Sequence, residues 1–254
     1  MKAYITLLST PEYLDGVLIL HQSLIETGAK YPLYVGITPN IPPDVREVLM
    51  KKKINIIELT SFSYNQKAKK AFSAWGVSHW WYTAAKVRIF GLVQFEKLVY
   101  LDSDMLVLKN IDHLFEKEDG TAAEDSPMIY QGKDHRNLNS GIMVITPSKE
   151  KEKKLIEFSF NRNVADQDLI RMLYSSWTEK YELHLPIGYN IHAKFIQEYL
   201  KKGVYEKDFF VLHFIGSKKP FMENYIKKRT PSKYEQYEEL YMETLFRSQK
   251  NIKI

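Results

Sequence analysis

The alternation of short apolar runs with amphipathic segments over the first sixty residues is the feature that most restricts the fold. Apolar runs at residues 3–8, 32–37 and 54–57 have the length and composition of buried strands. Residues 12–28 place apolar side chains at helical spacing, and the Pro-Pro-Asp run at 42–44 opens a second helix. This strand–helix order predicts a mostly parallel sheet with helices on both faces. Such sheets bind ligands at the carboxyl ends of their strands.

The rest of the chain continues the α/β pattern less regularly. Residues 62–80, with Lys67, Lys69 and Lys70 among small polar residues, predict an irregular segment. Further strands are expected at residues 97–101, 105–108, 142–145 and 209–213, and further helices at residues 82–95, 149–162, 166–175 and 232–247. The sequence therefore predicts one α/β domain over residues 1–254 that ends in a helical tail.

The composition narrows the class of protein. The absence of cysteine among 254 residues excludes disulfides, thiolate zinc sites and a cysteine nucleophile. No apolar run approaches the roughly 18 residues of a membrane-spanning helix. The N-terminal residues break too early for the apolar core of a signal peptide. A cytoplasmic protein without a transmembrane segment is therefore expected.

The positive charge of the chain is concentrated at its C-terminal end. Residues 201–254 carry 12 Lys+Arg and 7 Asp+Glu, a surplus of +5 that equals the surplus of the whole chain. Such a tail suits phosphate, an anionic membrane surface or nucleic acid, or it is simply the solvated face of a helix. Because no dense basic stripe or known nucleic-acid motif is present, no nucleic-acid partner is expected. Peripheral contact with a membrane stays open.

The sharpest local motif is Asp102-Ser103-Asp104, which directly follows the apolar run 98–101. Positions i and i+2 of an extended segment project to the same side. The two carboxylates therefore concentrate negative charge where the sheet opens to solvent, and a divalent cation offsets such repulsion. A turn with two solvated aspartates is the alternative. The apolar runs on both sides of the motif favour the cation.

A second group of candidate ligands follows the last expected strand. His213 ends this strand and offers an imidazole ligand for Mn²⁺ or a similar ion. Gly216 would allow the backbone to approach a phosphate, which Lys218 or Lys219 would neutralise. A structural histidine in the core is the alternative for His213.

Two further stretches suit the hydroxyl groups of a sugar. Asn139-Ser140-Gly141 precedes the strand expected at 142–145 and offers an amide, a hydroxyl and a bare backbone, unless it is an ordinary turn. Asp166-Gln167-Asp168 begins a helix, where the acids either cap the helix or face a substrate. Lys86, within an apolar helix, either reaches a phosphate or extends to solvent.

Taken in order, these motifs resemble glycosyltransferase family eight, the family of glycogenin and galactinol synthase. The resemblance runs from Ala3 to Phe221. It rests on Ala3–Leu8 with Tyr13, Lys86, the run Leu98–Phe115, Asn139-Ser140-Gly141, Asp166-Gln167, Leu185-Pro186, Tyr189-Asn190 and His213–Phe221. The closing pattern of the family, HxxGxxKP, maps onto His213, Gly216, Lys219 and Pro220.

The resemblance implies a GT-A fold, which is a single α/β domain with a Rossmann-like, mostly parallel central sheet, helices on both faces and a C-terminal helical tail. Residues 1–115 would form the nucleotide-binding half that ends in the DxD motif. Residues 116–221 would form the donor and acceptor half, and residues 222–254 a basic helical tail. The implied metal ligands for Mn²⁺, or another divalent cation, are Asp102, Asp104 and His213. The implied binding residues for a UDP-sugar are Leu7, Leu8, Ser9, Tyr13, Lys86, Asp102, Ser103, Asp104, Asn139, Ser140, Asp166, Gln167, His213, Gly216 and Lys219.

Members of this family retain the α configuration of the transferred sugar, and the resemblance makes Asp166 and Gln167 the catalytic candidates. Asp166 would stabilise positive charge at the anomeric carbon, with Gln167 close beneath it. A double displacement would need Asp166 or Asp168 as a nucleophile close to that carbon. A front-face route, in which the acceptor enters beside the departing UDP, needs no protein nucleophile. We favour the front-face route.

The expected function is Mn²⁺-dependent transfer of glucose or galactose from a UDP-sugar to a hydroxyl of a separate carbohydrate, polyol or glycolipid acceptor. In glycogenin, a tyrosine after the Tyr-Asn pair receives the first glucose. Here Gln197 occupies that place and Tyr199 follows two residues later, which argues against self-glucosylation. The alternatives are a self-glucosylating primer, a UDP-N-acetylglucosamine transferase and a catalytically silent UDP-sugar-binding protein. The resemblance also implies a homodimer.

A nucleotidyltransferase is the rival from another class of enzyme, since it too combines paired carboxylates with a parallel sheet. Such an enzyme usually carries a basic, glycine-rich loop after its first strand. Here Ser-Thr-Pro-Glu follows the first strand, at residues 9–12. The sequence therefore favours the glycosyltransferase.

Overall fold

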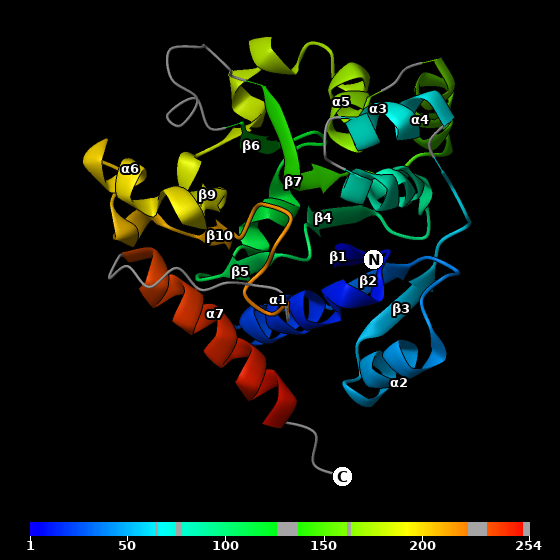
Figure 1. The fold of residues 1–254 in the computed structure, drawn as a ribbon. Coiled ribbons are helices and arrows are strands. Elements are labelled where there is room, and N and C mark those ends of the chain that lie inside the picture. The colour runs from blue at the N-terminus through cyan, green and yellow to red at the C-terminus, as the bar shows by residue number, and fades with distance from the viewer. Residues whose placement is uncertain (64–65, 75–77, 126–136, 162–163, 223–232, 251–254) are drawn as a thin grey trace.

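A computed structural model describes residues 1–63, 66–74, 78–125, 137–161, 164–222 and 233–250 of the chain. Within these residues, a seven-stranded sheet in the order β3-β2-β1-β4-β7-β6-β8 forms the centre, and a three-stranded sheet in the order β5-β10-β9 lies beside it (Figure 1). The strands of the large sheet are β1 (Lys2–Leu8), β2 (Leu33–Ile37), β3 (Asn55–Glu58), β4 (Lys97–Leu101), β6 (Ala122–Glu124), β7 (Leu138–Ile145) and β8 (His184–Leu185). Those of the small sheet are β5 (Met105–Val107), β9 (Ile191–His192) and β10 (Val211–His213).

The first three strands and their two helices form as the sequence predicts. β1, β2 and β3 run parallel, and α1 (Leu14–Glu26) and α2 (Pro43–Lys51) connect them. Pro43 stands in the first turn of α2, where its missing N–H leaves no helical hydrogen bond unmade. Gly28 follows α1 with a φ of 70°, a left-handed conformation that suits glycine at the end of a helix. Local sequence signals therefore define this half of the sheet.

The connection between β3 and β4 contains two helices, of which one was not expected. α3 (Gln66–Ala74) lies in the segment predicted to be irregular, so that prediction was wrong for these residues. Lysine, alanine and glutamine are good helix formers, and the apolar residues of this helix stand at helical spacing but are mostly alanines. The helix expected at 82–95 is a 3₁₀ helix, η2 (Ser78–Gly91), which begins earlier. Residues 64–65 and 75–77 of the predicted segment lie outside the described residues.

The direction of the sheet changes at β7. This strand pairs antiparallel with β4, with Leu98 opposite Ile145 and Leu101 opposite Ile142. It begins at Leu138, earlier than the sequence indicated, so Asn139-Ser140-Gly141 lies within the strand rather than before it and is not an ordinary turn. The backbone N–H of Asp102 donates to the carbonyl of Gly141 at 2.8 Å, which extends the pairing beyond the apolar core of the strand. The polar residues of β7 are thereby placed beside the end of β4.

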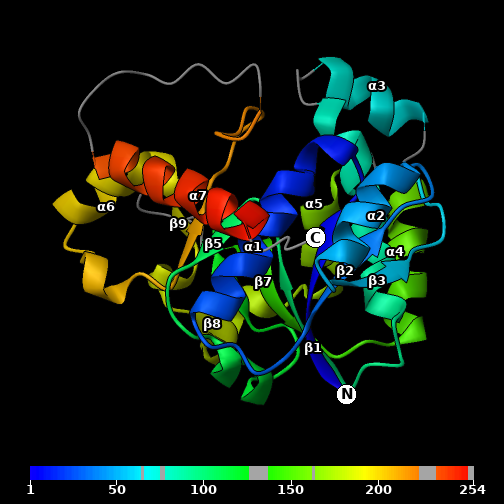
Figure 2. The same cartoon turned by 90° about the horizontal axis from the view of Figure 1, so that it is seen from below.

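The chain leaves the large sheet after Leu101 and enters the small sheet at Met105 as β5. β5 pairs antiparallel with β10, and β10 pairs parallel with β9. α6 (Ile196–Lys201) follows β9, and α7 (Lys233–Lys250) packs along α1 (Figure 2). The predicted tail helix is present, but it carries three basic and four acidic residues. The positive surplus of the tail therefore lies outside α7.

Two apolar clusters enclose the large sheet, one on each face. Alternate residues of β1 divide between them, with Tyr4 and Leu8 in one cluster and Ala3, Ile5 and Leu7 in the other. The first cluster includes α1, α2 and α7, and the second includes η2, α4 (Lys149–Asn161) and α5 (Asp166–Leu173). The predicted α/β fold with helices on both faces is thus confirmed. Across the described ranges, no helix has both the length and the apolar character to cross a membrane.

Short 3₁₀ helices make many of the remaining turns. They are η1 (Pro11–Tyr13), η3 (Asp112–Glu116), η4 (Trp177–Glu179), η5 (Tyr181–Leu183), η6 (Ile187–Tyr189), η7 (Ala193–Phe195) and η8 (Glu206–Asp208). Of these, η1 matters most for the site described below, because it follows the carboxyl end of β1.

Candidate functional site

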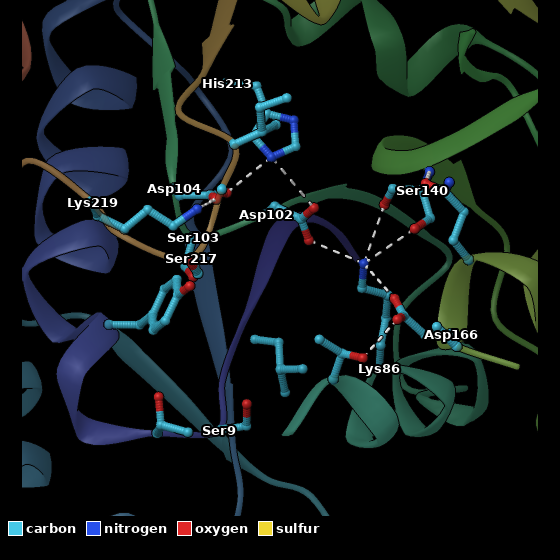
Figure 3. A pocket seen from close by; sticks show the side chains of 18 of the residues that line it. Ser9, Lys86, Asp102, Ser103, Asp104, Ser140, Asp166, His213, Ser217 and Lys219 are labelled. Carbon is cyan, nitrogen blue, oxygen red and sulfur yellow. Dashed lines mark hydrogen bonds and ion pairs between the residues drawn. The ribbon is translucent and has the colours of Figure 1, made fainter. Parts of the chain in front are cut away.

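A cavity of about 710 Å³ opens at the carboxyl ends of β1 and β4. Its wall consists of the segment Ser9–Tyr13 after β1, the turn after β4, the first turn of α5 and the loop after β10 (Figure 3). β1 and β4 are parallel neighbours, so both strands deliver the chain to the same edge of the sheet. Its volume is typical of a pocket for a small organic ligand. A cavity therefore lies at the edge of the sheet where the sequence predicts a binding site.

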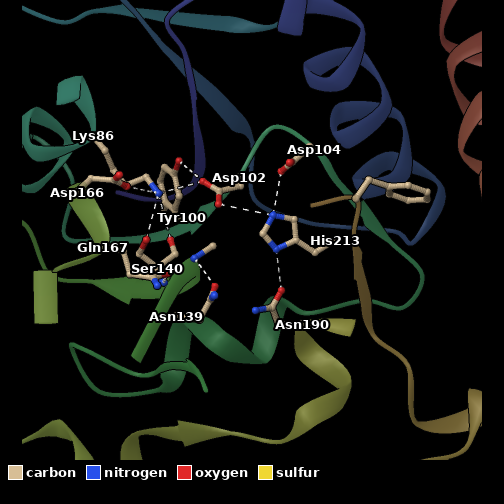
Figure 4. A network of polar contacts seen from close by, with 12 residues as sticks. Lys86, Tyr100, Asp102, Asp104, Asn139, Ser140, Asp166, Gln167, Asn190 and His213 are labelled. Carbon is tan, nitrogen blue, oxygen red and sulfur yellow. Dashed lines mark hydrogen bonds and ion pairs between the residues drawn. The ribbon is translucent and has the colours of Figure 1, made fainter. Parts of the chain in front are cut away.

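Asp102 and Asp104, from the turn between β4 and β5, meet His213, from the end of β10, in this cavity (Figure 4). His213 Nε2 lies 3.1 Å from Asp104 Oδ1 and 3.8 Å from Asp102 Oδ2. One ligand atom from each residue lies within 4.8 Å of the others. The imidazole reaches the motif because His213 is opposite Met105 in the ladder between β5 and β10. Strand pairing, rather than chain proximity, builds this group.

The hydrogen bonding of His213 suits a metal ligand. Its Nδ1 donates to Asn190 Oδ1 at 2.9 Å, so Nε2 keeps a lone pair when the ring is neutral. A lone pair at 3.1 Å from a carboxylate oxygen is repulsive unless a proton or a cation lies between them. Two carboxylates and one imidazole are a donor set that suits Mn²⁺ and related ions. The residues therefore fit a divalent cation.

Lys219 neutralises the buried side of this group. Its ammonium donates to Asp104 Oδ2 and, at 2.8 Å, to the carbonyl of Phe214. Burial by itself would raise the pKa of the Asp104 carboxyl, but the Lys219 ammonium and the contact with His213 outweigh it and lower that pKa. Asp104 is therefore ionised and available to a cation.

Lys86 joins the motif to the opposite wall of the cavity. Its buried Nζ lies 3.0 Å from Asp102 Oδ1, 2.9 Å from Asp166 Oδ2 and 3.3 Å from Ser140 Oγ. Burial would lower the pKa of this ammonium, yet Asp102 and Asp166 raise it well above its usual value. Tyr100 donates to Asp102 Oδ1 at 2.7 Å, and its ring centroid lies 4.6 Å from the same ammonium. The lysine does not extend to solvent; it is the centre of a buried polar network.

The first turn of α5 presents its side chains to the cavity. Asp166 accepts a hydrogen bond from Thr83 at 2.6 Å besides its ion pair with Lys86, and no side chain caps this helix. Gln167 Oε1 accepts from the backbone N–H of Ser140 at 3.1 Å. The sequence left open whether this stretch caps the helix or faces a ligand. In the structure, the side chains of Asp166 and Gln167 both face the cavity.

The cavity brings together most of the residues singled out in the sequence. Those that line it are Leu7, Ser9, Tyr13, Lys86, Asp102, Ser103, Asp104, Ser140, Asp166, Gln167, His213, Gly216 and Lys219. Leu8 does not, because strand alternation turns it into the apolar core. Asn139 does not either, because its side chain bonds to Asp125 and to the backbone of Gly141.

Several polar side chains of the site were not found by sequence reasoning. Thr83 and Asn190 bond to partners far away in the chain, and Asn190 was noted only as part of the Tyr189-Asn190 pair. Tyr100 lies two residues before its partner Asp102 but belongs to an apolar run, which did not mark its hydroxyl. Arg171 lies one turn after Gln167 on a helix already assigned to the site, and that spacing was a signal that could have found it.

Comparison with known proteins gives one consistent result. The family model described as Glycosyl transferase family 8 matches residues 4–224. Human glycogenin-1 is 30% identical over 247 residues, which cover 93% of this chain and 67% of that protein. Galactinol synthase 3 of Arabidopsis thaliana is 37% identical over 120 residues, which cover 47% of this chain and 35% of that protein. The matched family is the one that the motifs resemble.

Among solved structures, the galactosyltransferase LgtC in complex with donor and acceptor sugar analogues aligns with a TM-score of 0.61. The alignment covers 96% of each chain at 14% sequence identity. A similarity at this identity concerns the fold alone, and it agrees with the GT-A architecture expected from the sequence.

Proposed function

The chain belongs to glycosyl transferase family 8, and from this premise we propose that it transfers a hexose from a UDP-sugar to a hydroxyl of a separate acceptor. The transfer retains the configuration at the anomeric carbon and uses a divalent cation, with Mn²⁺ the first candidate. The observation that carries the proposal is the group of Asp102, Asp104 and His213 at the carboxyl edge of the sheet, flanked by two buried lysines. UDP-glucose and UDP-galactose are the preferred donors.

The charges of the cavity support a cation-dependent donor. Its lining includes five carboxylates and three permanent cations, which gives a formal charge of −2 with His213 neutral. The acids are Glu12, Asp102, Asp104, Asp166 and Asp168, and the cations are Lys86, Arg171 and Lys219. A diphosphate would be repelled by this lining. A divalent cation removes the surplus and supplies positive charge for the leaving UDP.

The protein groups divide the donor between two halves of the cavity. Lys219, beside Asp104 and the loop with Gly216, is placed to neutralise phosphate. Leu7, Ser9 and Tyr13, from the segment after β1, would contact the nucleoside. On the opposite side, Ser140, Asp166 and Gln167 would bind the sugar. We divide the donor in this way because the proposed metal ligands lie between the residues proposed for the nucleotide and those proposed for the sugar.

The contacts of Asp166 favour a front-face route. One carboxylate oxygen is held by Thr83 and the other by Lys86, so both are occupied by donors. A group held in this way stabilises positive charge at the anomeric carbon more readily than it forms a bond to that carbon. In this route the acceptor hydroxyl proton passes to an oxygen of the departing diphosphate, and Lys219 stabilises the negative charge that stays there.

A separate acceptor is favoured over self-glucosylation. Tyr199, the tyrosine nearest to the position used in glycogenin, is 0% exposed and packs in the core below α7. It does not line the cavity, so its hydroxyl has no path to the donor in this conformation. A carbohydrate or polyol acceptor entering through the mouth of the cavity needs no such rearrangement.

The proposal is tested by UDP release from UDP-glucose, UDP-galactose and their N-acetyl forms, with Mn²⁺ and with a chelator. Release from one donor that depends on Mn²⁺ is the expected result. Tight UDP binding without release from any donor would instead indicate a silent binding protein. Absence of Mn²⁺-dependent UDP binding would contradict the assignment of Asp102, Asp104 and His213.

A further inference from the structure

Arg171 connects three segments that are far apart in the sequence. Its Nε donates to the carbonyl of Leu138 at 2.8 Å, one terminal nitrogen donates to Asp168 at 3.2 Å and the other pairs with Asp125. These partners lie at the start of β7, on α5 and just after β6. Arg171 lines the cavity, yet its charge is directed at protein groups rather than at a ligand.

Asp125 extends this arrangement to the side of the cavity assigned to the sugar. One carboxylate oxygen accepts from Asn139 Nδ2 at 2.8 Å. The other accepts from Gln167 Nε2 at 3.4 Å and also pairs with Arg171. Because Gln167 Oε1 accepts from the N–H of Ser140, both ends of the Gln167 amide have a partner.

These partners determine which way the amide points. A side-chain amide has nearly the same shape after a rotation of 180°, so its partners alone decide where the oxygen lies. A carboxylate only accepts hydrogen bonds and a backbone N–H only donates them. Asp125 therefore selects the nitrogen end of Gln167, and Ser140 selects the oxygen end. The guanidinium of Arg171 is also held by the Leu138 carbonyl and by Asp168, so the nitrogen that pairs with Asp125 has a fixed position that a single ammonium would lack.

We propose that Arg171 is a positioning residue of this transferase, which acts through Asp125 to hold the Gln167 amide in one orientation. The inference rests on the proposed function, because the orientation of the amide affects turnover only if Gln167 binds the donor sugar. Without the guanidinium, Asp125 turns away and the amide rotates. The loss then falls on kcat, because the diphosphate is bound in the other half of the cavity.

The test compares Arg171→Met with Arg88→Met as a matched control. The Arg88 side chain is 22% exposed against 21% for Arg171, pairs with Glu152 at 3.1 Å and donates to the carbonyl of Ser61. It does not line the cavity. We expect kcat of Arg171→Met to fall about 10- to 100-fold with Mn²⁺-dependent UDP affinity unchanged. Arg88→Met keeps kcat, while its melting temperature falls to a similar extent. Equal kcat in the two variants would overturn the proposal.

A double-variant cycle tests whether Asp125 is the connection. Asp125→Asn replaces an acceptor by a group that also donates, so it no longer selects one end of the amide. The variant with both changes should lose no more kcat than the worse single variant, because both remove the same constraint. Additive losses would contradict the connection. Arg171→Lys should recover part of kcat, since the charge remains without the fork.

A third measurement does not depend on turnover. The side-chain NH₂ signal of Gln167, identified by its loss in Gln167→Glu, should report the bond to Asp125 in an NMR spectrum. We expect Arg171→Met to shift this signal and Arg88→Met to leave it in place. An unshifted signal in Arg171→Met would overturn the proposal whatever the kinetics. The expected shifts in a protein that releases no UDP from any donor would uphold the positioning role and refute the proposed function.

Discussion

Lys86 and Lys219 bury their ammonium groups against the two aspartates of one motif, yet they belong to different halves of the cavity. They are 4% and 2% exposed, respectively. Lys219 pairs with Asp104 next to His213 and the small sheet. Lys86 pairs with Asp102 and with Asp166, on the side of β7 and α5. Two lysines that are both buried and both paired with an aspartate therefore contact different sets of groups.

Asp102 is the residue that connects these two sets of groups. Its Oδ2 faces His213, while its Oδ1 accepts from Lys86 and Tyr100. A cation bound by the motif would thus be coupled to Lys86, which forms the ion pair with Asp166. The comparison shows that the two carboxylates of a short DxD motif pair with different lysines, while both also face His213. The following variants test this division, from the largest expected effect to the smallest.

The largest effect is expected for Asp104→Asn, which removes a metal ligand and the partner of Lys219. Mn²⁺-dependent UDP release should fall about 1,000-fold, whereas the circular dichroism spectrum stays that of a folded protein. Asp44→Asn, an exposed change of the same kind on α2, is the control that keeps full turnover. Turnover retained in Asp104→Asn would remove this residue from the metal site.

Lys86→Met should affect the reaction more than donor binding. It leaves Asp102 and Asp166 facing each other without a cation, so kcat should fall roughly 100-fold and UDP affinity much less. Asp166 is buried, whereas the side chain of Asp102 is 28% exposed, so we expect a loss of about 2 kcal/mol in unfolding free energy. Kinetics and denaturant titration measure the two quantities. A loss confined to UDP affinity would contradict the division.

Lys219→Met should show the opposite pattern. The charge-assisted contact with phosphate is lost, and UDP affinity in the presence of Mn²⁺ should fall about 10-fold. The kcat at saturating donor should fall less than in Lys86→Met. Calorimetry with UDP and Mn²⁺, carried out on both variants, provides the direct comparison. Equal effects on affinity in the two variants would mean that both lysines serve the diphosphate.

The smallest effect is expected for Tyr100→Phe. This change removes the hydrogen bond to Asp102 Oδ1 but leaves the ion pair with Lys86. One hydrogen bond to a charged group is worth about 1.5 kcal/mol, so kcat should fall roughly 10-fold at most, with UDP affinity unchanged. Steady-state kinetics at saturating donor measure the change. A weaker affinity for UDP would place Tyr100 with the other half of the cavity.

The parts of the fold that were predicted correctly depend on local periodicity. The runs at 3–8 and 32–37 and the helix ended by Gly28 could be recognised from a few neighbouring residues. α3 was missed because most of its apolar residues are alanines among lysines, so their helical spacing is a weak signal. The early start of β7 was missed because pairing with the end of β4, rather than apolar character, extends the strand to Leu138.

The residues of the candidate site also divide into those that the sequence predicted and those that it did not. Asp102, Asp104, His213 and Lys219 were identified from motif and order, and the structure brings them together. Leu8 was included with its neighbours although strand alternation turns it into the core. Thr83 and Asn190 were not predictable as supports of the site, because their positions in the chain are far from the groups that they contact.

The sequence by itself determined the family, the parallel half of the sheet and the types of chemical group at its edge. These follow from residue order and from periodicities that a short window contains. Only the tertiary structure decided which atoms meet. The register between β5 and β10 brings His213 to the motif, and Asn190 then sets its tautomer. The antiparallel β7 carries Ser140 to Lys86, and Arg171 connects three distant segments. Such contacts depend on strand pairing and packing across the whole chain, which no local pattern encodes.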